Sequence, residues 1–297
     1  MPVPHAFHIV DVFAESRYAG NTLAVVRDAA DLDGARMQAI AREFGFSETT
    51  FVISDPRDAL GAGVRVRIFT PTFELPFAGH PTLGTAWVVR ERLLPERPRA
   101  VTLALGVGPV GVAFEPSPEG GELVWLTAPP VTLGAEIAPE EIAEVLGLAP
   151  SELDPVLPAQ RAAAGPKFAI VPLRRREALG RIRFDLDAYR AFARVEASTG
   201  VYVFAREAED PVNHMRARMF FDAAGMREDP ATGSATACLG AYLLAHRSHG
   251  SDFTLRIEQG VEMGRPSLLQ LDARVESGRP RIRVGGRVIE SARGELV

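Results

Sequence analysis

A motif that occurs twice constrains the fold of this chain more than any other feature. The first copy starts with Arg65-Val-Arg67-Ile-Phe69 and, ten residues beyond Phe69, reaches Gly79-His-Pro-Thr-Leu-Gly84. The second copy, about 150 residues later, starts with Arg216-Ala-Arg218-Met-Phe220 and, ten residues beyond Phe220, reaches Pro230-Ala-Thr-Gly-Ser-Ala235. Each copy predicts a strand, a turn and a run of small residues that opens an apolar helix. Because the first turn of a helix has backbone N–H groups that suit an anion, the repetition predicts a duplicated fold whose halves share one cleft.

The length and the pattern of elements predict two domains of the α+β class. A chain of 297 residues is longer than a typical single domain. The expected strands outnumber the expected helices and mostly neighbour other strands, which favours α+β over a regular βαβ alternation. We expect an N-terminal domain over residues 1–120, which can recruit a last strand near 286–297, and a C-terminal domain over residues 121–285.

Hydrophobic periodicity and turn residues predict the individual elements. The expected helices are Leu32–Phe44, Thr82–Leu94, Pro139–Leu146, Leu186–Arg194 and Ser234–His246. The segment Pro158–Pro166, with four alanines and two prolines, predicts a loop.

The composition disfavours several classes of partner. A net charge of −5 argues against binding to nucleic acid, because such binders normally carry a basic face. The chain contains no run of about 20 apolar residues that would cross a membrane, and its N-terminus does not resemble a signal peptide. Cys238 is the single cysteine and cannot form an internal disulfide, so we expect a cytoplasmic protein.

The motifs favour neither a cofactor nor a metal. Gly106-Val-Gly-Pro-Val-Gly111 matches the letters of a dinucleotide fingerprint, but a strand rather than a helix is expected to follow it, which favours a hairpin turn. The six histidines lack the spacing of metal ligands. Cys238 lies in an apolar helix and is expected to be a core residue, which argues against a racemase that uses two thiols.

Glu48 is a candidate acid/base because it lies among aromatic and β-branched residues, in Phe44-Gly-Phe-Ser-Glu-Thr-Thr-Phe51. Burial raises the pKa of a carboxyl group, as a proton shuttle near neutral pH requires. The sequence leaves open that Glu48 faces solvent at the start of a strand.

His80 is a candidate because it follows Gly79 at a predicted helix start. The positive end of the helix dipole disfavours a protonated imidazole there. A histidine whose ring is satisfied by the local backbone is an equally good interpretation of the sequence alone.

Asp229, Thr232 and Ser234 surround the second helix start. Each is a residue type that commonly caps a helix, and local physics does not separate capping from binding.

Taken together, these segments resemble the PhzF family, phenazine-biosynthesis-type isomerases whose fold is related to that of diaminopimelate epimerase. The matching stretches, in chain order, are Asp11-Val-Phe-Ala14, Gly20-Asn21, Ala24-Val25, Ala41-Arg-Glu-Phe-Gly-Phe-Ser-Glu-Thr-Thr-Phe-Val52, Arg67-Ile-Phe-Thr-Pro71, Glu74-Leu-Pro-Phe-Ala-Gly-His-Pro81, Arg218-Met-Phe220, Glu228-Asp229, Ala231-Thr-Gly-Ser-Ala235 and Gln259-Gly-Val-Glu-Met-Gly-Arg-Pro-Ser267. They cover essentially the whole chain in order.

The resemblance implies a role for each candidate. It makes Glu48 the general acid/base and places His80 and Asp229 as catalytic residues that orient the substrate. The resemblance also implies that Ser234 faces the cleft. From helix geometry, the two helix starts, with Gly79 in the first and Thr232, Gly233 and Ser234 in the second, are expected to bind the substrate and supply N–H donors to its carboxylate.

The resemblance also implies the architecture and the reaction. We expect two similar domains, each a curled, mostly antiparallel sheet around a central helix, with the active site between them, in a protein that forms a homodimer. The implied activity is a cofactor-independent isomerisation of a small carboxylate, and the best-known reaction of the family converts trans-2,3-dihydro-3-hydroxyanthranilate. A related epimerase or lyase acting on an amino or hydroxy acid, and a non-catalytic binder of small carboxylates, remain as alternatives.

Overall fold

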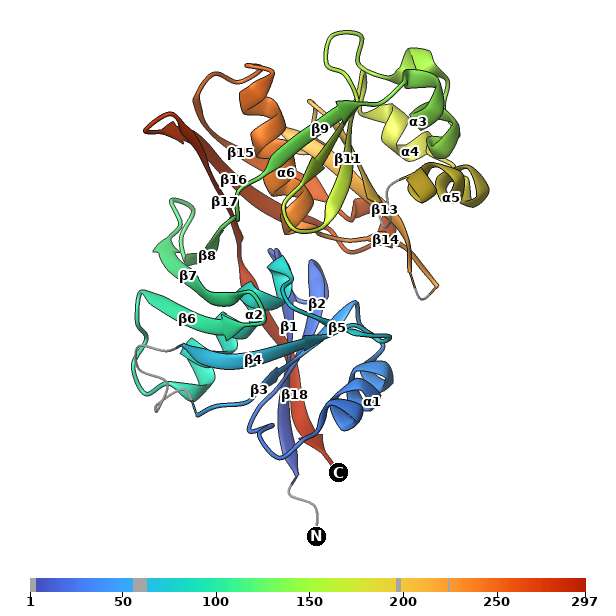
Figure 1. Ribbon diagram of the computed structural model, residues 1–297. Coiled ribbons are helices and arrows are strands. Elements are labelled where there is room, and N and C mark those ends of the chain that lie inside the picture. The colour runs from blue at the N-terminus through green and yellow to red at the C-terminus, as the bar shows by residue number, and fades with distance from the viewer. Residues whose placement is uncertain (1–3, 56–62, 196–198, 224) are drawn as a thin grey trace. The chain divides into compact units, whose positions relative to one another are not determined.

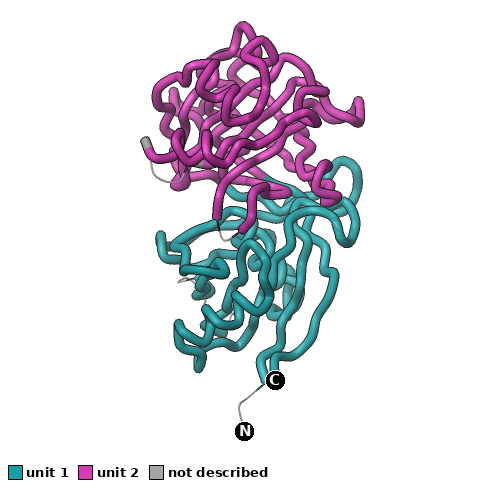
Figure 2. Tube along the Cα trace, turned by 90° about the vertical axis from the view of Figure 1, so that its right-hand side faces the viewer, with its two compact units in different colours: residues 1–126, 285–297 teal, residues 127–284 magenta. Residues whose placement is uncertain are grey.

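The computed structural model describes residues 4–55, 63–195, 199–223 and 225–297, and it divides into two compact units (Figure 2). Unit 1 comprises Met1–Leu126 and Gly285–Val297, and unit 2 comprises Thr127–Val284. The chain leaves unit 1 within strand β8 (Glu122–Thr127) and returns to it within strand β17 (Arg279–Gly286).

Unit 1 is a curled sheet around one helix (Figure 1). Its paired strands follow one another in the order β18 (Val288–Leu296), β1 (His5–Val12), β2 (Asn21–Val26), β3 (Glu48–Val52), β4 (Val64–Phe69), β6 (Ala100–Leu105), β7 (Gly108–Pro116) and β8, and the short β5 (Glu74–Leu75) also pairs with β4. All of these pairs are antiparallel except β2–β3 and β4–β6. Helix α2 (Gly79–Val88) contacts β1, β2, β3, β6 and β7, while α1 (Gly34–Phe44) packs against β3 and β4.

Unit 2 repeats this arrangement. Its strand order is β9 (Thr132–Glu136), β10 (Gln160–Ala163), β11 (Lys167–Leu173), β12 (Thr199–Ala205), β13 (Met215–Ala223), β15 (Asp252–Gln259) and β16 (Ser267–Glu276), and β14 (Met226–Asp229) pairs with β13 as β5 pairs with β4. The parallel pairs, β11–β12 and β13–β15, fall at the same two places as in unit 1. Helix α6 (Gly233–Ala245) contacts β9, β10, β11 and β16. The expectation of an α+β protein with two similar, mostly antiparallel halves is confirmed.

The remaining helical segments lie outside this repeated plan. They are α3 (Pro139–Leu146), α4 (Glu177–Arg181), α5 (Leu186–Val195), the 3₁₀ turns Pro150–Glu152 and Val261–Met263, and a π-helical turn, Val89–Leu93, that continues α2. Helices α3, α4 and α5 gather on one side of unit 2 (Figure 1). Among the described residues, no helix is both long and apolar enough to cross a membrane.

The two central helices are apolar all round because each is enclosed by its sheet. Eight of the ten residues of α2 and ten of the thirteen residues of α6 are buried. Glycine lets each helix approach the strands closely: a Cβ added to Gly84 would lie 2.6 Å from Leu23 Cδ2, and one added to Gly240 would lie 2.9 Å from Leu271 Cδ1. Each central helix is therefore packed closely against the sheet that surrounds it.

The structure tests the sequence interpretation of two non-helical segments, residues 106–111 and 158–166. The glycines at 106–111 lie in a β6–β7 hairpin, with Leu105 opposite Gly108, so the hairpin reading is confirmed. The expectation that Pro158–Pro166 is a loop is wrong, because β10 occupies its middle and pairs with β9 and β11. Ala162 of β10 is buried, and small side chains suit that crowded position in the sheet.

We expect Gly84→Ala to destabilise the protein by about 1–2 kcal/mol, because overpacking against Leu23 and Val12 outweighs the better helix propensity of alanine. Gly111→Ala is the matched control, since a Cβ at that strand position meets nothing within 4 Å. Denaturant unfolding would measure both changes. Equal stability of the two variants would contradict the close packing of α2.

Candidate active site

A bidentate ion pair precedes the helix start of unit 1. Arg67 on β4 donates from Nε and Nη2 to the two carboxylate oxygens of Glu74, at 2.7 and 2.6 Å. These hydrogen bonds hold the pKa of Glu74 below its ordinary value. The Arg67 guanidinium also lies over the ring of Phe69, 5.0 Å from its centroid. The pair thus fixes the turn that leads from β4 to α2.

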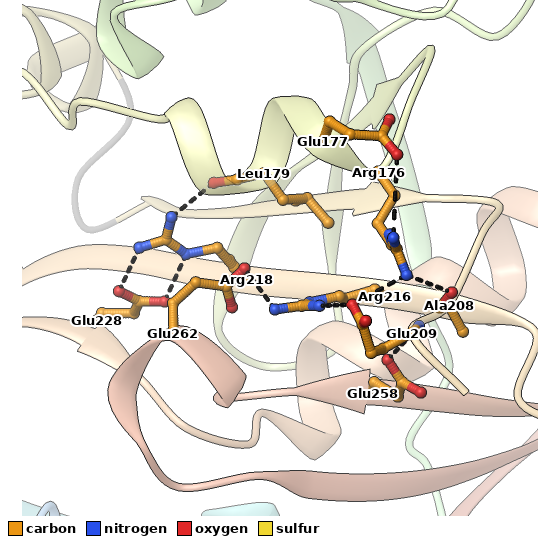
Figure 3. Close-up of polar contacts among 10 residues, drawn as sticks. All are labelled: Arg176, Glu177, Leu179, Ala208, Glu209, Arg216, Arg218, Glu228, Glu258 and Glu262. Carbon is orange, nitrogen blue, oxygen red and sulfur yellow. Dashed lines mark hydrogen bonds and ion pairs between the residues drawn. The ribbon is translucent and has the colours of Figure 1, made fainter.

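Unit 2 has an equivalent bidentate ion pair before its own helix start. Arg218 on β13 donates to both oxygens of Glu228, each at 2.8 Å, and lies 4.7 Å from the ring centroid of Phe220. Figure 3 shows this pair together with a further bond from Arg218 to the carbonyl oxygen of Leu179, at 2.6 Å. Because both carboxylate oxygens of Glu228 accept hydrogen bonds from Arg218, the backbone that leads into the next residue, Asp229, is also constrained.

A second cluster in Figure 3 fixes the end of β15. Glu258 is buried and accepts from the backbone N–H groups of Glu209 and Asp210, at 2.8 and 2.9 Å. Arg216 pairs with Glu209 and with Glu262, both at 2.9 Å. These bonds anchor the strand position immediately before Gln259.

Neither central helix has a side-chain cap at its start. The N-cap residues are Ala78 for α2 and Thr232 for α6, and neither side chain caps its helix. The first N–H groups of a helix have no acceptor within the helix, so those of Gly79 and Gly233 suit an anion. Pro81 in the first turn of α2 has no N–H to contribute.

Glu48 and His80 meet in unit 1. Glu48 is the first residue of β3, and its side chain is only 16% exposed. His80 is the second residue of α2, with a side chain 7% exposed. Glu48 Oε2 lies 3.5 Å from His80 Nε2. The alternative that Glu48 faces solvent at a strand start is therefore wrong: it does begin the strand, but its carboxylate is largely buried beside an imidazole.

The imidazole of His80 is neutral. Burial lowers the pKa of His80 to about 3, and a hydrogen bond to the backbone of Thr22 opposes this shift only in part. The sequence suggested a lowered proton affinity from the helix dipole; the direction is the same, but burial is the main cause. His80 Nε2 makes no hydrogen bond within the described part of the chain, so the bond to Thr22 involves Nδ1. That bond fixes the ring orientation and leaves Nε2 toward Glu48.

Asp229, Thr232 and Gln259 meet in unit 2. The Thr232 hydroxyl donates to Asp229 Oδ2 at 2.5 Å. The buried Gln259 side chain donates to the Thr232 hydroxyl at 3.1 Å and accepts from the Thr232 N–H at 3.2 Å. Thr232 therefore directs its polar groups toward protein partners just before Gly233 and Ser234 open helix α6.

The structure thus gathers the candidates into one group per unit. Glu48, Gly79 and His80 lie together in unit 1, and Asp229 lies beside the start of α6 in unit 2. Whether both groups serve a single cleft stays a prediction. Their catalytic and binding roles also stay predictions.

Sequence reasoning missed two residues that hold these groups. Thr22 bonds to His80 through its backbone, and Gln259 bonds to Thr232 through its side chain. Both lie in or beside stretches that carry the family resemblance, Gly20-Asn21 and Gln259-Gly260, but nothing local in the sequence shows which distant residue they contact.

The structure also bears on metal and thiol chemistry. Across the described ranges, no three His, Cys, Asp or Glu side chains are arranged to hold a metal ion. Cys238 is buried, as expected, and burial raises the pKa of its thiol to about 12. A thiol with that pKa is not a nucleophile or base near neutral pH.

Comparison with known proteins agrees with this description. The chain is 38% identical over 297 residues to an uncharacterized isomerase of Mesorhizobium japonicum, with 97% of each chain covered. It is 36% identical over 264 residues to a trans-2,3-dihydro-3-hydroxyanthranilate isomerase of Pseudomonas aeruginosa, with 89% of this chain and 88% of that protein covered.

Solved structures give the same assignment. A Bacillus anthracis phenazine biosynthesis protein of the PhzF family matches with a TM-score of 0.90 and 26% identity, over 100% of both chains. A probable proline racemase from Agrobacterium radiobacter shares the fold alone, with a TM-score of 0.63 and 13% identity over 99% of this chain and 93% of that one. The sequence model of the family described as phenazine biosynthesis-like protein (PhzC-PhzF) matches residues 10–294, and the chain belongs to this family.

Proposed function

We propose that the protein is a cofactor-independent isomerase that moves a proton between two positions of a small carboxylate, most like trans-2,3-dihydro-3-hydroxyanthranilate isomerase. The observation that carries the proposal is the Glu48–His80 pair, a largely buried carboxyl group next to a neutral imidazole at a helix start. Relatives at 35–36% identity with that activity support it.

Glu48 is the proton shuttle in this proposal. It takes a proton from one carbon of the substrate and returns it to another position on the same face. A protonated imidazole 3.5 Å away would hold Glu48 in its ionised form, whereas the neutral His80 does not. Burial limits exchange of the carried proton with water. His80 orients the substrate and the carboxyl group without changing its own charge.

The helix starts bind the substrate carboxylate. The N–H groups of Gly79, Gly233 and Ser234 point from helix N-termini, each of which contributes roughly 0.3–1 kcal/mol to anion binding. Asp229 accepts a hydrogen bond from a donor group of the substrate. Acid/base catalysis supplies on the order of 10²–10⁴-fold, and positioning supplies the rest of the rate enhancement.

Comparison of the two units favours one acid/base rather than two. The pairing of β3 with β4 places Thr49 opposite Phe69, and the pairing of β12 with β13 places Val201 opposite Phe220. The counterpart of Glu48 is therefore Gly200. A Cβ added to Gly200 would lie 2.9 Å from Phe168, so this position of unit 2 has no room for a second base. A racemase whose two bases occupy equivalent positions of the two units would need one there.

We expect Glu48→Gln to lower isomerisation by about 10²–10⁴-fold, because an amide cannot accept and return the proton. Incubation of trans-2,3-dihydro-3-hydroxyanthranilate in D₂O, followed by mass spectrometry and NMR of the product, measures both turnover and deuterium uptake. Glu43→Gln on the exposed face of α1 is the matched control and should retain the wild-type rate.

The same experiment separates the alternatives. Turnover by Glu48→Gln at the wild-type rate, with the same deuterium content in the product, would mean that Glu48 is not the shuttle. A product with inverted configuration or an eliminated group would indicate an epimerase or a lyase. Ligand binding without turnover or exchange on any of a panel of small acids would indicate a non-catalytic binder.

The neutral state of His80 predicts a pH dependence of stability. Because its pKa falls from 6.5 in the unfolded chain to about 3 in the folded protein, the unfolded state binds more protons between these values. His80 therefore contributes stability above pH 6.5 that is lost as the pH falls toward 3, with a slope of about 1.4 kcal/mol per pH unit. His80→Asn should flatten the dependence of unfolding free energy on pH between 4 and 6. Parallel curves for the two proteins would show that His80 is not held neutral.

We also propose that the protein forms a homodimer in the cytoplasm and binds neither nucleic acid nor a cofactor. The dimer and the absence of a cofactor rest on the family resemblance, the absence of nucleic acid on the net charge of −5, and the cytoplasm on the single cysteine. Sedimentation equilibrium should give twice the mass of the 32.1 kDa chain. A single-chain mass at micromolar concentration would remove the dimer from the proposal.

A further inference from the structure

Gln259 is a fully buried side chain at the end of β15 whose amide is bonded on both sides. Its Nε2 donates to the carbonyl oxygen of Asp229 at 2.8 Å and to the hydroxyl of Thr232 at 3.1 Å. Its Oε1 accepts from the backbone N–H of Thr232 at 3.2 Å. One side chain thus ties together both ends of the segment that opens helix α6.

The direction of each bond is fixed by the main chain. The Asp229 carbonyl can only accept and the Thr232 N–H can only donate, so the Gln259 amide has one allowed orientation. In that orientation Nε2 donates to Thr232 Oγ1. The hydroxyl has a single proton, and that proton is therefore directed to Asp229 Oδ2, 2.5 Å away. Each side chain therefore donates to the next one: Gln259 donates to Thr232, and Thr232 donates to Asp229.

Unit 1 has apolar residues at the three corresponding positions. Asp229 lies opposite Met219 on β13, as Leu75 lies opposite Ile68 on β4. Thr232 is the N-cap residue of α6, as Ala78 is of α2. The correspondence of the third position follows from β15 and β6, in which Ile257 pairs with Met215 and Leu103 pairs with Val64. Two residues further along these strands, Gln259 corresponds to Leu105.

The glycines that come directly after Gln259 and Leu105 confirm that these two positions correspond. A Cβ on Gly260 would lie 2.6 Å from the carbonyl oxygen of Pro230, and one on Gly106 would lie 2.8 Å from Cα of Pro76. The same close approach therefore exists in both units. The backbone frame is shared, and unit 2 differs by having a hydrogen-bonded trio, Asp229, Thr232 and Gln259, where unit 1 has Leu75, Ala78 and Leu105.

We infer that Gln259 is a positioning residue that acts through the Thr232 hydroxyl to hold Asp229 as a carboxylate in a fixed orientation. This inference rests on the proposed role of Asp229 in the isomerisation. It also changes the expected role of Thr232, whose hydroxyl orients Asp229 instead of contacting the substrate. The neighbouring Glu228 is held by Arg218, so the charged group next in sequence to Asp229 is already paired.

Three variants isolate this chain of bonds. Gln259→Leu introduces the residue type of the unit 1 position without adding charge, Thr232→Val removes the hydroxyl, and Thr232→Ser keeps it. Thr232→Val removes the hydrogen bond to the Asp229 carboxylate, and Gln259→Leu leaves the Thr232 hydroxyl without the donor that directs its proton to Asp229. Each change should lower kcat about 10- to 100-fold, with a smaller change in KM. Thr232→Ser should stay within about threefold of the wild type. Gln270→Leu on β16 is the matched control for replacing a glutamine.

A double-mutant cycle tests whether Gln259 acts through Thr232. If it does, Gln259→Leu should lower kcat by no more than about threefold in a Thr232→Val background. A full, multiplicative loss in that background would overturn the inference.

A measurement without turnover distinguishes this inference from the proposed function. The titration of the Asp229 carboxyl group, followed by ¹³C NMR in the substrate-free protein, should move to higher pH in Gln259→Leu and in Thr232→Val, because a donated hydrogen bond favours the charged form. An unchanged titration in either variant would overturn the inference. A shifted titration with unchanged kcat would support the bonding chain and reject the catalytic role of Asp229. Retained thermal unfolding transitions would establish that each variant is folded.

Discussion

Each unit depends on enclosing one apolar helix within a curled sheet. The enclosure leaves little room, and glycines such as Gly84 and Gly240 are needed where the helix meets the strands. It also fixes where each helix begins, because the ion pairs of Arg67 and Arg218 hold the preceding turns. A helix held in this way cannot shift to satisfy its first N–H groups. The packing that stabilises each unit is therefore also what keeps the uncapped helix start in place, where its N–H groups suit an anion.

The shared frame carries different polar groups in the two units. Unit 1 has Glu48 and His80 where unit 2 has Gly200 and Ser234. Unit 2 has the Asp229 trio where unit 1 has leucine and alanine. Each unit is thus specialised at positions that are small or apolar in the other. This division is what the proposed isomerisation with a single acid/base requires of a duplicated fold.

Much of the fold could be predicted because local signals agreed with tertiary packing. Helix α3 has the predicted limits, with Pro139 in its first turn and Gly147 in the left-handed conformation at its end. Strand β10 was missed because its alanines and flanking prolines resemble a loop, and its pairing with β9 and β11 is a long-range property. For the same reason the sequence pointed to Glu48 and His80 but not to Gln259, whose contacts lie 27 and 30 residues away.

The pairing of the first strand with the last has a consequence for how the protein is made. β1 and β18 pair from His5 with Leu296 to Val12 with Val288, so the sheet of unit 1 joins the first and the last of the described strands. A ribosome releases β1 first and β18 last. Unit 2, which lies within a continuous segment, can complete its sheet while unit 1 still lacks one strand. During synthesis the edge of β1 that pairs with β18 stays unpaired until β18 has left the ribosome.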